Sequence, residues 1–154
     1  MKVREIMTSD VKTCRPETNL AEVVKLMWER DCGVLPIVNA NGTVFGMITD
    51  RDICVAIATR GQTADRIAVR DVTAGKACTC APDDDAIAAL QTMKSQRVRR
   101  LPVVDAEGRL TGILSLNDVV THAGAASATE IVSTMASICE HRRPRAMAGA
   151  ASRA

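Results

Sequence analysis

Two short stretches of the sequence share a pattern that could bind a ligand. The first runs from Gly46 to Asp52, and the second runs from Gly112 to Asp118. Each consists of a glycine, two apolar residues, a hydroxyl side chain, two further residues and an aspartate. A hydroxyl followed three residues later by an acid predicts a helix N-terminus held by a capping box. A helix start also favours anions, so the same side chains could instead face an anionic ligand.

The spacing leaves both interpretations open. Glu is the usual acid of a capping box, yet both stretches carry Asp. Capping also does not account for the glycine three residues before the hydroxyl, a residue type that lets backbone or ligand approach closely. The four residues that could serve either role are Thr49, Asp52, Ser115 and Asp118.

Composition narrows the class of protein. A chain of 154 residues can bury a core of its own, and its net charge of +2 gives no reason to expect a nucleic-acid partner. Trp28 and Phe45 are the only aromatic residues, too few for stacking of unpaired bases. No apolar run is long enough to cross a bilayer, and the N-terminal residues do not form a signal peptide. We therefore expect a cytoplasmic protein that binds neither nucleic acid nor membrane.

The residues that could carry catalysis or bind metal form no recognisable motif. Six cysteines in such a chain are expected to be free thiols, and Cys78 and Cys80 have the wrong spacing for a common zinc site. His122 and His141 have no nucleophile at a suitable spacing, so each is expected at a surface or cap position. The sequence predicts no metal site and no enzyme. A thiol-based redox or metal sensor and a weak nucleotide hydrolase remain alternatives.

The two stretches belong to an internal repeat. One constant shift along the sequence, here called the repeat shift, superposes residues 3–53 on residues 69–119 without gaps. The matches include prolines and glycines, which mark backbone geometry. Apolar periodicity and turn residues predict the order β-α-β-β-α in each copy. The predicted helices begin near residues 20 and 86 and at Thr49 and Ser115, with Gly61 and Gly124 as C-caps. The predicted strands cover residues 34–38, 43–48, 101–104 and 109–114.

These elements suggest a division of the chain. The predicted parts are a first unit (1–60), a linker (61–68), a second unit (69–124), a C-terminal amphipathic helix (125–142) and a disordered tail (143–154). Neither unit of about 50 residues should bury enough apolar surface to be stable alone. We therefore expect the two units to pack sheet against sheet.

The repeated unit resembles the cystathionine β-synthase (CBS) domain. The resemblance covers about residues 3–122 and rests on the order of several features: the repeat itself, the Leu-Pro-[Ile/Val]-Val strands, the Asn-Gly or Glu-Gly turns and the two Gly-to-Asp stretches. Two such domains form a Bateman module, and we expect this one to stand alone. The resemblance implies an α/β (α+β) fold with two units related by a pseudo-twofold axis. It also implies a homodimer and regulatory binding of adenine nucleotides in clefts between the units.

The resemblance also implies binding residues. Thr49 with Asp52, and Ser115 with Asp118, fall on the family's ribose-binding positions, and a carboxylate can accept hydrogen bonds from both ribose hydroxyls. Met47 and Ile113 would contact the base. The residues facing Asp52 would be Ala77, Cys78, Thr79, Val98, Arg99 and Arg100. The residues facing Asp118 would be Val11, Lys12, Thr13, Cys32, Gly33 and Val34.

The two clefts are not expected to be alike. Arg99 and Arg100 align with Gly33 and Val34, so guanidinium groups suited to phosphate are expected only in the Asp52 cleft. Lys12 is the only cation expected in the Asp118 cleft. The sequence therefore predicts tighter binding of a phosphorylated nucleotide in the Asp52 cleft.

The function predicted from the sequence is regulatory binding. We expect the protein to sense AMP, ADP or ATP, to need no cofactor, and to signal to a separate effector protein. The main alternative from another class is a structural or interaction module whose clefts bind nothing. Melting experiments with nucleotides separate these possibilities, and thiol titration with metal analysis tests the sensor alternative.

Overall fold

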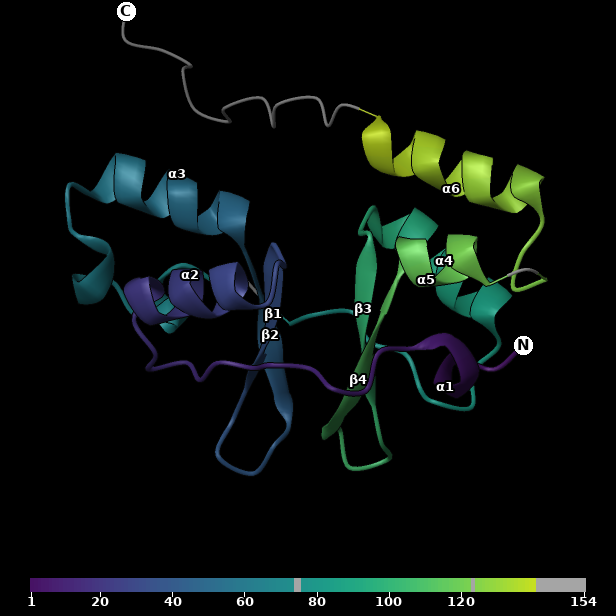
Figure 1. Ribbon diagram of the computed structural model, residues 1–154, viewed down its shortest axis with the longest axis horizontal. Coiled ribbons are helices and arrows are strands. Elements are labelled where there is room, and N and C mark those ends of the chain that lie inside the picture. Colours follow the sequence, from purple (N-terminus) through teal and green to yellow (C-terminus); the bar gives the residue numbers. More distant parts are fainter. Residues whose placement is uncertain (74–75, 123, 141–154) are drawn as a thin grey trace, which may run out of the picture.

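The computed structural model describes residues 1–73, 76–122 and 124–140. It shows two lobes side by side, each built on one antiparallel pair of strands (Figure 1). The two strand pairs stand next to each other at the centre, and helices flank them. This arrangement confirms the predicted mixed α/β fold.

Each lobe repeats the order helix, strand, strand, helix. The first lobe contains α2 (Leu20–Glu29), β1 (Val34–Val38), β2 (Val44–Thr49) and α3 (Asp50–Arg60). The second contains α4 (Ala86–Gln96), β3 (Arg100–Val104), β4 (Leu110–Ser115) and α5 (Leu116–Thr121). The strands pair in the same register, with Val34 opposite Thr49 and Arg100 opposite Ser115. Because the repeat shift relates these two pairs, the sequence repeat is also a structural repeat.

The second helices of the two lobes end differently. Gly61 caps α3 with a left-handed φ of 61°. Glycine adopts this conformation without strain. In the second lobe α5 is shorter and its cap is His122, whose Nδ1 lies 2.7 Å from the carbonyl oxygen of Asp118. The prediction that Gly124 caps this helix is wrong, because the chain leaves the helix before it reaches this glycine.

Each lobe completes its core with residues from the other half of the chain. Val3 and Ile6 of the short helix α1 (Val3–Ile6) are buried in the core of the second lobe. Ile67 and Val69 are buried in the core of the first lobe. Ile67 follows the short 3-10 helix η1 (Ala64–Arg66), and Val69 begins a second one, η2 (Val69–Asp71).

Backbone hydrogen bonds hold these crossing segments in place. The N–H of Val3 donates to the carbonyl of Asp84 at 2.9 Å, and the N–H of Leu20 donates to the carbonyl of Ile67 at 3.0 Å. The stretch 61–68, predicted to be a linker, thus contributes a core residue, Ile67. These exchanged segments bury apolar side chains in the opposite lobe. Each Å² of apolar area buried stabilises the association of the two lobes by about 25 cal/mol.

A last helix, α6 (Ala128–Cys139), packs against α4. Its inner face carries Ile131 and Ile138, which contact the second core, and Thr134, which is 2% exposed. Val132 and Met135 lie on its outer face and are exposed. The helix is amphipathic, as the sequence predicted, while His141 and the tail 143–154 lie outside the described residues.

Candidate functional site

The hydroxyl and the acid of each repeated motif bind one another at the start of a helix. Thr49 Oγ1 donates to Asp52 Oδ2 at 2.6 Å, and the Asp52 N–H donates back to Thr49 Oγ1 at 3.2 Å. The second motif repeats this geometry, with Ser115 Oγ 2.7 Å from Asp118 Oδ2. Both motifs are therefore capping boxes, and the capping interpretation is correct as far as local structure goes.

Capping uses only one oxygen of each aspartate. Oδ2 of Asp52 also accepts the backbone N–H of Thr49, at 2.9 Å, and Oδ2 of Asp118 accepts that of Ser115, at 2.7 Å. Among the described residues, no hydrogen bond reaches Oδ1 of either aspartate. Each carboxylate thus keeps an acceptor that could bind a ligand hydroxyl.

Two cavities lie between the lobes, one next to each motif. The first, here called the Met47 cavity, has a volume of about 190 Å³. Its lining residues are Met47, Thr73, Lys76, Ala77, Cys78, Gln96, Val98, Arg100 and Pro102. Met47 comes from the first half of the repeat and the others come from the second. This cavity therefore brings together five of the residues predicted to form the Asp52 cleft.

The second cavity, here called the Ile113 cavity, has a volume of about 290 Å³. Its lining residues are Thr8, Asp10, Val11, Lys12, Arg30, Cys32, Val34, Leu35, Arg100 and Ile113. The two cavities are related by the repeat, because the repeat shift takes Val11 to Ala77, Cys32 to Val98 and Met47 to Ile113. Val11, Lys12, Cys32, Val34 and Ile113 lie together as predicted.

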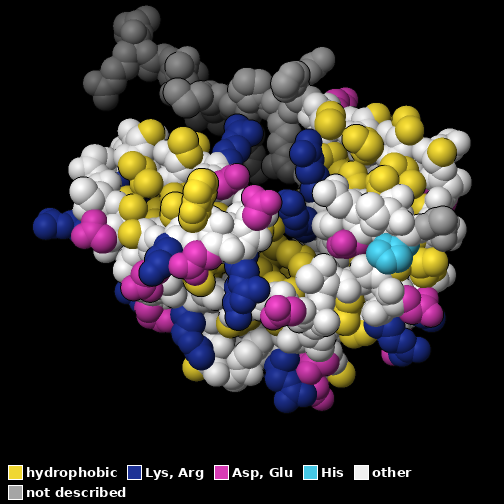
Figure 2. All heavy atoms as spheres, viewed as in Figure 1, with side chains coloured by type: hydrophobic (Ala, Val, Ile, Leu, Met, Phe, Trp, Pro, Cys, Tyr) yellow, Lys and Arg dark blue, Asp and Glu magenta, His cyan; other side chains and the backbone are white. Residues whose placement is uncertain are grey.

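The charges of the two cavities differ from the sequence-based expectation. Arg100 lines both cavities, and Arg30 joins Lys12 in the Ile113 cavity. The prediction that Lys12 is the only cation there is therefore wrong. The physical reason is that alignment of repeats compares positions within a lobe, whereas Arg100 starts β3 at the junction between the lobes. Figure 2 shows Lys and Arg side chains gathered at this junction.

An acid also distinguishes the cavities. Asp10 lines the Ile113 cavity and lies 3.7 Å from Arg30, while its counterpart in the Met47 cavity is Lys76. The described lining of the Met47 cavity contains no acid. Its cations therefore have no acidic neighbour in that lining to neutralise them, whereas Arg30 has one.

Several predicted residues are not in the described lining of either cavity. Arg99 turns towards α6, where its guanidinium lies 3.9 Å from Cys139 Sγ. Thr79 is exposed, and Thr13 lines a separate hollow of about 220 Å³. Gly33 lines a groove on the outer side of the first lobe. None of the four capping residues is in the described lining of either cavity.

Sequence reasoning missed several polar lining residues. They are Thr8, Asp10, Arg30, Thr73, Lys76 and Gln96. The repeat shift pairs Asp10 with Lys76 and Arg30 with Gln96, so the repeat contains a signal for them. That signal is weak, because the members of each pair are chemically dissimilar and a search for matching residue types passes over them.

Some thiols line the cavities, and others are buried in the cores of the lobes. Cys32 lines the Ile113 cavity and Cys78 lines the Met47 cavity. Cys14 and Cys80 are buried, and burial raises the pKa of their thiols to about 11 and about 12, because it disfavours the charged thiolate. Within the described residues, no three Cys, His, Asp or Glu side chains come close enough together to hold a metal.

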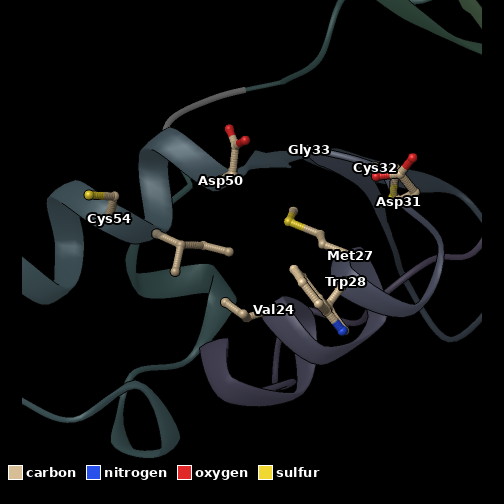
Figure 3. A pocket seen from close by; sticks show the side chains of 9 residues that line it. Val24, Met27, Trp28, Asp31, Cys32, Gly33, Asp50 and Cys54 are labelled. Carbon is tan, nitrogen blue, oxygen red and sulfur yellow. The ribbon is translucent and has the colours of Figure 1, made fainter.

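A third hollow lies on the outer side of the first lobe. It is a groove of about 510 Å³ between α2 and α3 (Figure 3), lined by Val24, Met27, Trp28, Asp31, Cys32, Gly33, Asp50, Ile53 and Cys54. Trp28 is 86% exposed. In the second lobe the residues at the equivalent positions of Val24 and Trp28 are Leu90 and Lys94, and both lie against α6. In the part of the chain that the structure describes, the groove that α6 covers in one lobe is therefore open in the other.

Comparison with known proteins supports this description. The family model for the CBS domain matches residues 3–59 and 69–124. The chain is 32% identical over 120 residues to the CBS domain-containing protein YhcV from Bacillus subtilis, covering 78% of this chain and 84% of that protein.

Solved structures have the same fold. The CBS domain protein TA0289 from Thermoplasma acidophilum superposes with a TM-score of 0.77 at 27% identity, covering 89% of this chain and 75% of the other. The structure of CBSX2 in complex with AMP superposes with a TM-score of 0.68 at 26% identity, covering 77% and 93% of the two chains.

Other curated relatives are longer. The chain spans 23%, 61% and 21% of the lengths of three of them, of which the first and third are named as enzymes. The match to these proteins therefore covers their CBS regions and does not transfer their reactions. In the part of the chain that the structure describes, no helix is long and apolar enough to cross a membrane.

Proposed function

The chain belongs to the CBS domain family, and on that basis we propose that it binds an adenine nucleotide (AMP, ADP or ATP) in the cavities between its lobes and signals its occupancy to another protein. The observation that carries this proposal is the pair of repeat-related cavities. Each combines an aliphatic side chain from one half of the repeat with walls from the other, and Arg100 lines both.

The chemistry of the cavities suits an adenosine nucleotide. Met47 and Ile113 offer apolar contact to the faces of the base. Side chains two apart on a strand lie on the same face, so Thr49 follows Met47 and Ser115 follows Ile113 towards the helix starts. The free Oδ1 of Asp52 or Asp118 would accept from a ribose hydroxyl. Arg100 would bind phosphate, because a guanidinium pairs with phosphate oxygens through parallel hydrogen bonds.

The size of the cavities favours the Ile113 cavity for an entire nucleotide. Ligand sites usually measure about 300 Å³ or more. Of the two cavities, the Ile113 cavity is the one whose volume, about 290 Å³, comes near this value. The Met47 cavity is smaller but carries Lys76 and Arg100 without an acid in its described lining. Volume thus favours the Ile113 cavity, whereas charge favours the Met47 cavity. We propose that each can bind nucleotide, with the phosphate placed near Arg100.

We further propose that a second copy of the chain covers the open groove between α2 and α3. Val24 and Trp28 are exposed there at 43% and 86%, although the equivalent positions of the second lobe lie against α6. Figure 2 shows hydrophobic side chains over this lobe. Two copies that bury these faces against each other would form a symmetric dimer. The regulated protein would then bind the dimer as a separate chain.

Thermal melting with a panel of nucleotides tests the proposal. A ligand at about 100 times its dissociation constant contributes about 2.7 kcal/mol, which raises the melting temperature of a chain of this size by roughly 5–10 °C. We expect AMP, ADP or ATP to produce such a shift, and inorganic phosphate to produce none. If no adenosyl compound shifts melting by about 1 °C at millimolar concentration, the structural-module alternative is favoured instead.

A further inference from the structure

The segment between α4 and β3 has two faces with different neighbours. Arg97 and Arg99 reach towards α6, whereas Val98 and Arg100 line the Met47 cavity. Arg97 ends α4 in the left-handed conformation, with a φ of 55°, and β3 begins at Arg100. Residues 97–100 therefore form a short bridge with α6 on one side and the cavity on the other.

The contacts on the α6 side fix this bridge at several points. The Arg97 guanidinium donates to Glu140 Oε2 at 2.6 Å, and Arg99 contacts Cys139. One turn earlier, Lys94 Nζ donates to Ser133 Oγ at 2.6 Å. Thr134, 2% exposed, and Ile138 pack inward beneath these polar contacts.

The backbone of the bridge continues to the second motif. The carbonyl of Arg99 accepts from the N–H of Leu116, the first residue of α5, at 2.9 Å. Arg100 pairs with Ser115 in the sheet. A displacement of residues 97–100 would therefore move a cavity wall and a capping residue together.

The first lobe lacks this arrangement, although its local backbone is the same. Asp31 and Arg97 occupy equivalent positions, and both have left-handed φ values, 47° and 55°. Asp31 nevertheless lines the open groove between α2 and α3, and no described helix takes the place that α6 has beside Arg97. Because α6 begins beyond residue 124, it also lies outside both regions matched by the family model. It is an addition to the repeated unit, and its polar contacts are with residues 94–99 of the second lobe.

We propose that α6 is a positioning element for the Met47 cavity: by holding Arg97 and Arg99 it sets the places of Val98 and Arg100, and occupancy of that cavity in turn strengthens the docking of α6. The second half of this inference rests on the proposed binding of nucleotide. By thermodynamic linkage, whatever α6 docking contributes to nucleotide affinity, nucleotide contributes equally to α6 docking. The outer face of α6, with Val132 and Met135, would then report the state of the cavity to a protein that binds there.

The test uses the full chain and two matched double variants. The release variant, Thr134→Asp with Ile138→Asp, places two charges on the inner face of α6. The control variant, Val132→Asp with Met135→Asp, places the same charges on its exposed outer face. A third variant, Glu140→Lys, reverses one exposed charge and cannot disturb the core. Hydrogen exchange of α6 amides measures docking in each protein.

The first readout needs no nucleotide. Cys78 lines the Met47 cavity, whereas Cys32 lines both the Ile113 cavity and the open groove. Alkylation by iodoacetamide, quantified by peptide mass spectrometry, therefore reports the Met47 cavity at Cys78 and the first lobe at Cys32. We expect the release variant to speed alkylation of Cys78 about fivefold or more and Glu140→Lys to speed it less. Cys32 should react unchanged in all proteins, and the control variant should match the wild type at both cysteines. Equal Cys78 rates in the release and control variants would overturn the positioning role.

The second readout adds AMP. In the wild type, saturating AMP should slow alkylation of Cys78 and slow hydrogen exchange of α6, and the release variant should bind AMP about tenfold more weakly at this cavity. If AMP binds no protein in the set but the release variant still exposes Cys78, the nucleotide proposal fails and the positioning role stands. If AMP binds the release and control variants equally, the linkage between α6 and the cavity is wrong.

Discussion

Thr49 Oγ1 lies 2.6 Å from Asp52 Oδ2, and the same pair exchanges a second hydrogen bond in the opposite direction. The chain contains a third such box at α6, where Ser127 Oγ lies 2.7 Å from Glu130 Oε2. Glu therefore performs the capping role in this protein as well as Asp does. We infer that Asp in both repeats meets another requirement, and a free Oδ1 that can accept from a ligand hydroxyl would meet it.

This comparison predicts that capping and binding can be separated at Asp52. Asp52→Glu should keep the box and change the free energy of unfolding by less than about 0.5 kcal/mol, whereas Asp52→Ala should lower it by about 1 kcal/mol. Both variants should bind AMP more weakly, because the longer side chain moves the second oxygen and the shorter one removes it. Urea unfolding and AMP titration measure the two effects. An Asp52→Glu protein with normal AMP affinity would assign Asp52 to capping alone.

Arg100 is expected to serve both cavities. Arg100→Ala should weaken AMP about 10-fold to 100-fold, because a charge-assisted hydrogen bond contributes about 1.5–3 kcal/mol. Adenosine, which has no phosphate, should bind nearly as before. Arg66→Ala removes a cation from an exposed 3-10 helix and provides the control. Equal losses for AMP and adenosine would show that Arg100 supports the cavity wall and does not bind phosphate.

The repeat made most of the architecture predictable from the sequence. Glycines, prolines and capping residues at a constant shift define backbone geometry in both copies, and the strands begin and end at or next to their predicted positions. Outside the repeat, the helical periodicity of the apolar residues between 131 and 139 predicted α6.

The exchange between the lobes could not be predicted in this way. Val3 aligns with Val69, yet each is buried in the core of the opposite lobe, a result of tertiary packing that periodicity does not contain. For the same reason Arg99 lies against α6 and not, as predicted, in a cavity. Which of two adjacent arginines faces a ligand depends on the register of one strand relative to a helix that follows much later in the chain.

The open groove predicts how the chain associates. Trp28→Lys introduces the residue found at the equivalent position of the second lobe, and it should convert the dimer into a monomer at micromolar concentration in analytical ultracentrifugation. Phe45→Lys, on β2, should leave the dimer intact. Because Trp28 is the only tryptophan, its fluorescence should shift to the blue as the wild-type chain is concentrated. A wild-type chain that remains monomeric with unchanging fluorescence would contradict this arrangement.

The buried thiols predict a loss of stability at alkaline pH. Their pKa values are raised from 9.0 to about 11 for Cys14 and to about 12 for Cys80, so the folded state holds protons that the unfolded state releases. Their contribution is fully present below pH 9 and is lost as the pH rises from 9 towards 11 or 12. At pH 10 the loss should be of the order of 1 kcal/mol per thiol. The chain has no tyrosine to titrate in the same range.

Urea midpoints measured from pH 7 to pH 10.5 check this expectation. Cys14→Ala and Cys80→Ala should each reduce the loss of stability between pH 9 and pH 10.5. This holds whatever change in stability each substitution causes at pH 7. Cys54→Ala, at an exposed position, should leave its slope unchanged. A decline of the same slope in all three variants would assign the alkaline loss to other groups.

Calorimetric titration of AMP into the wild-type chain and into a variant carrying both Met47→Glu and Ile113→Glu tests the central claim most directly. Both side chains are only partly buried, so the variant should fold, while each new carboxylate puts a negative charge on the apolar wall for the base and repels phosphate. We expect saturable binding of at least one AMP per wild-type chain and no binding by the variant. Absence of binding heat in the wild type at millimolar AMP, or unchanged binding in the variant, would contradict the account.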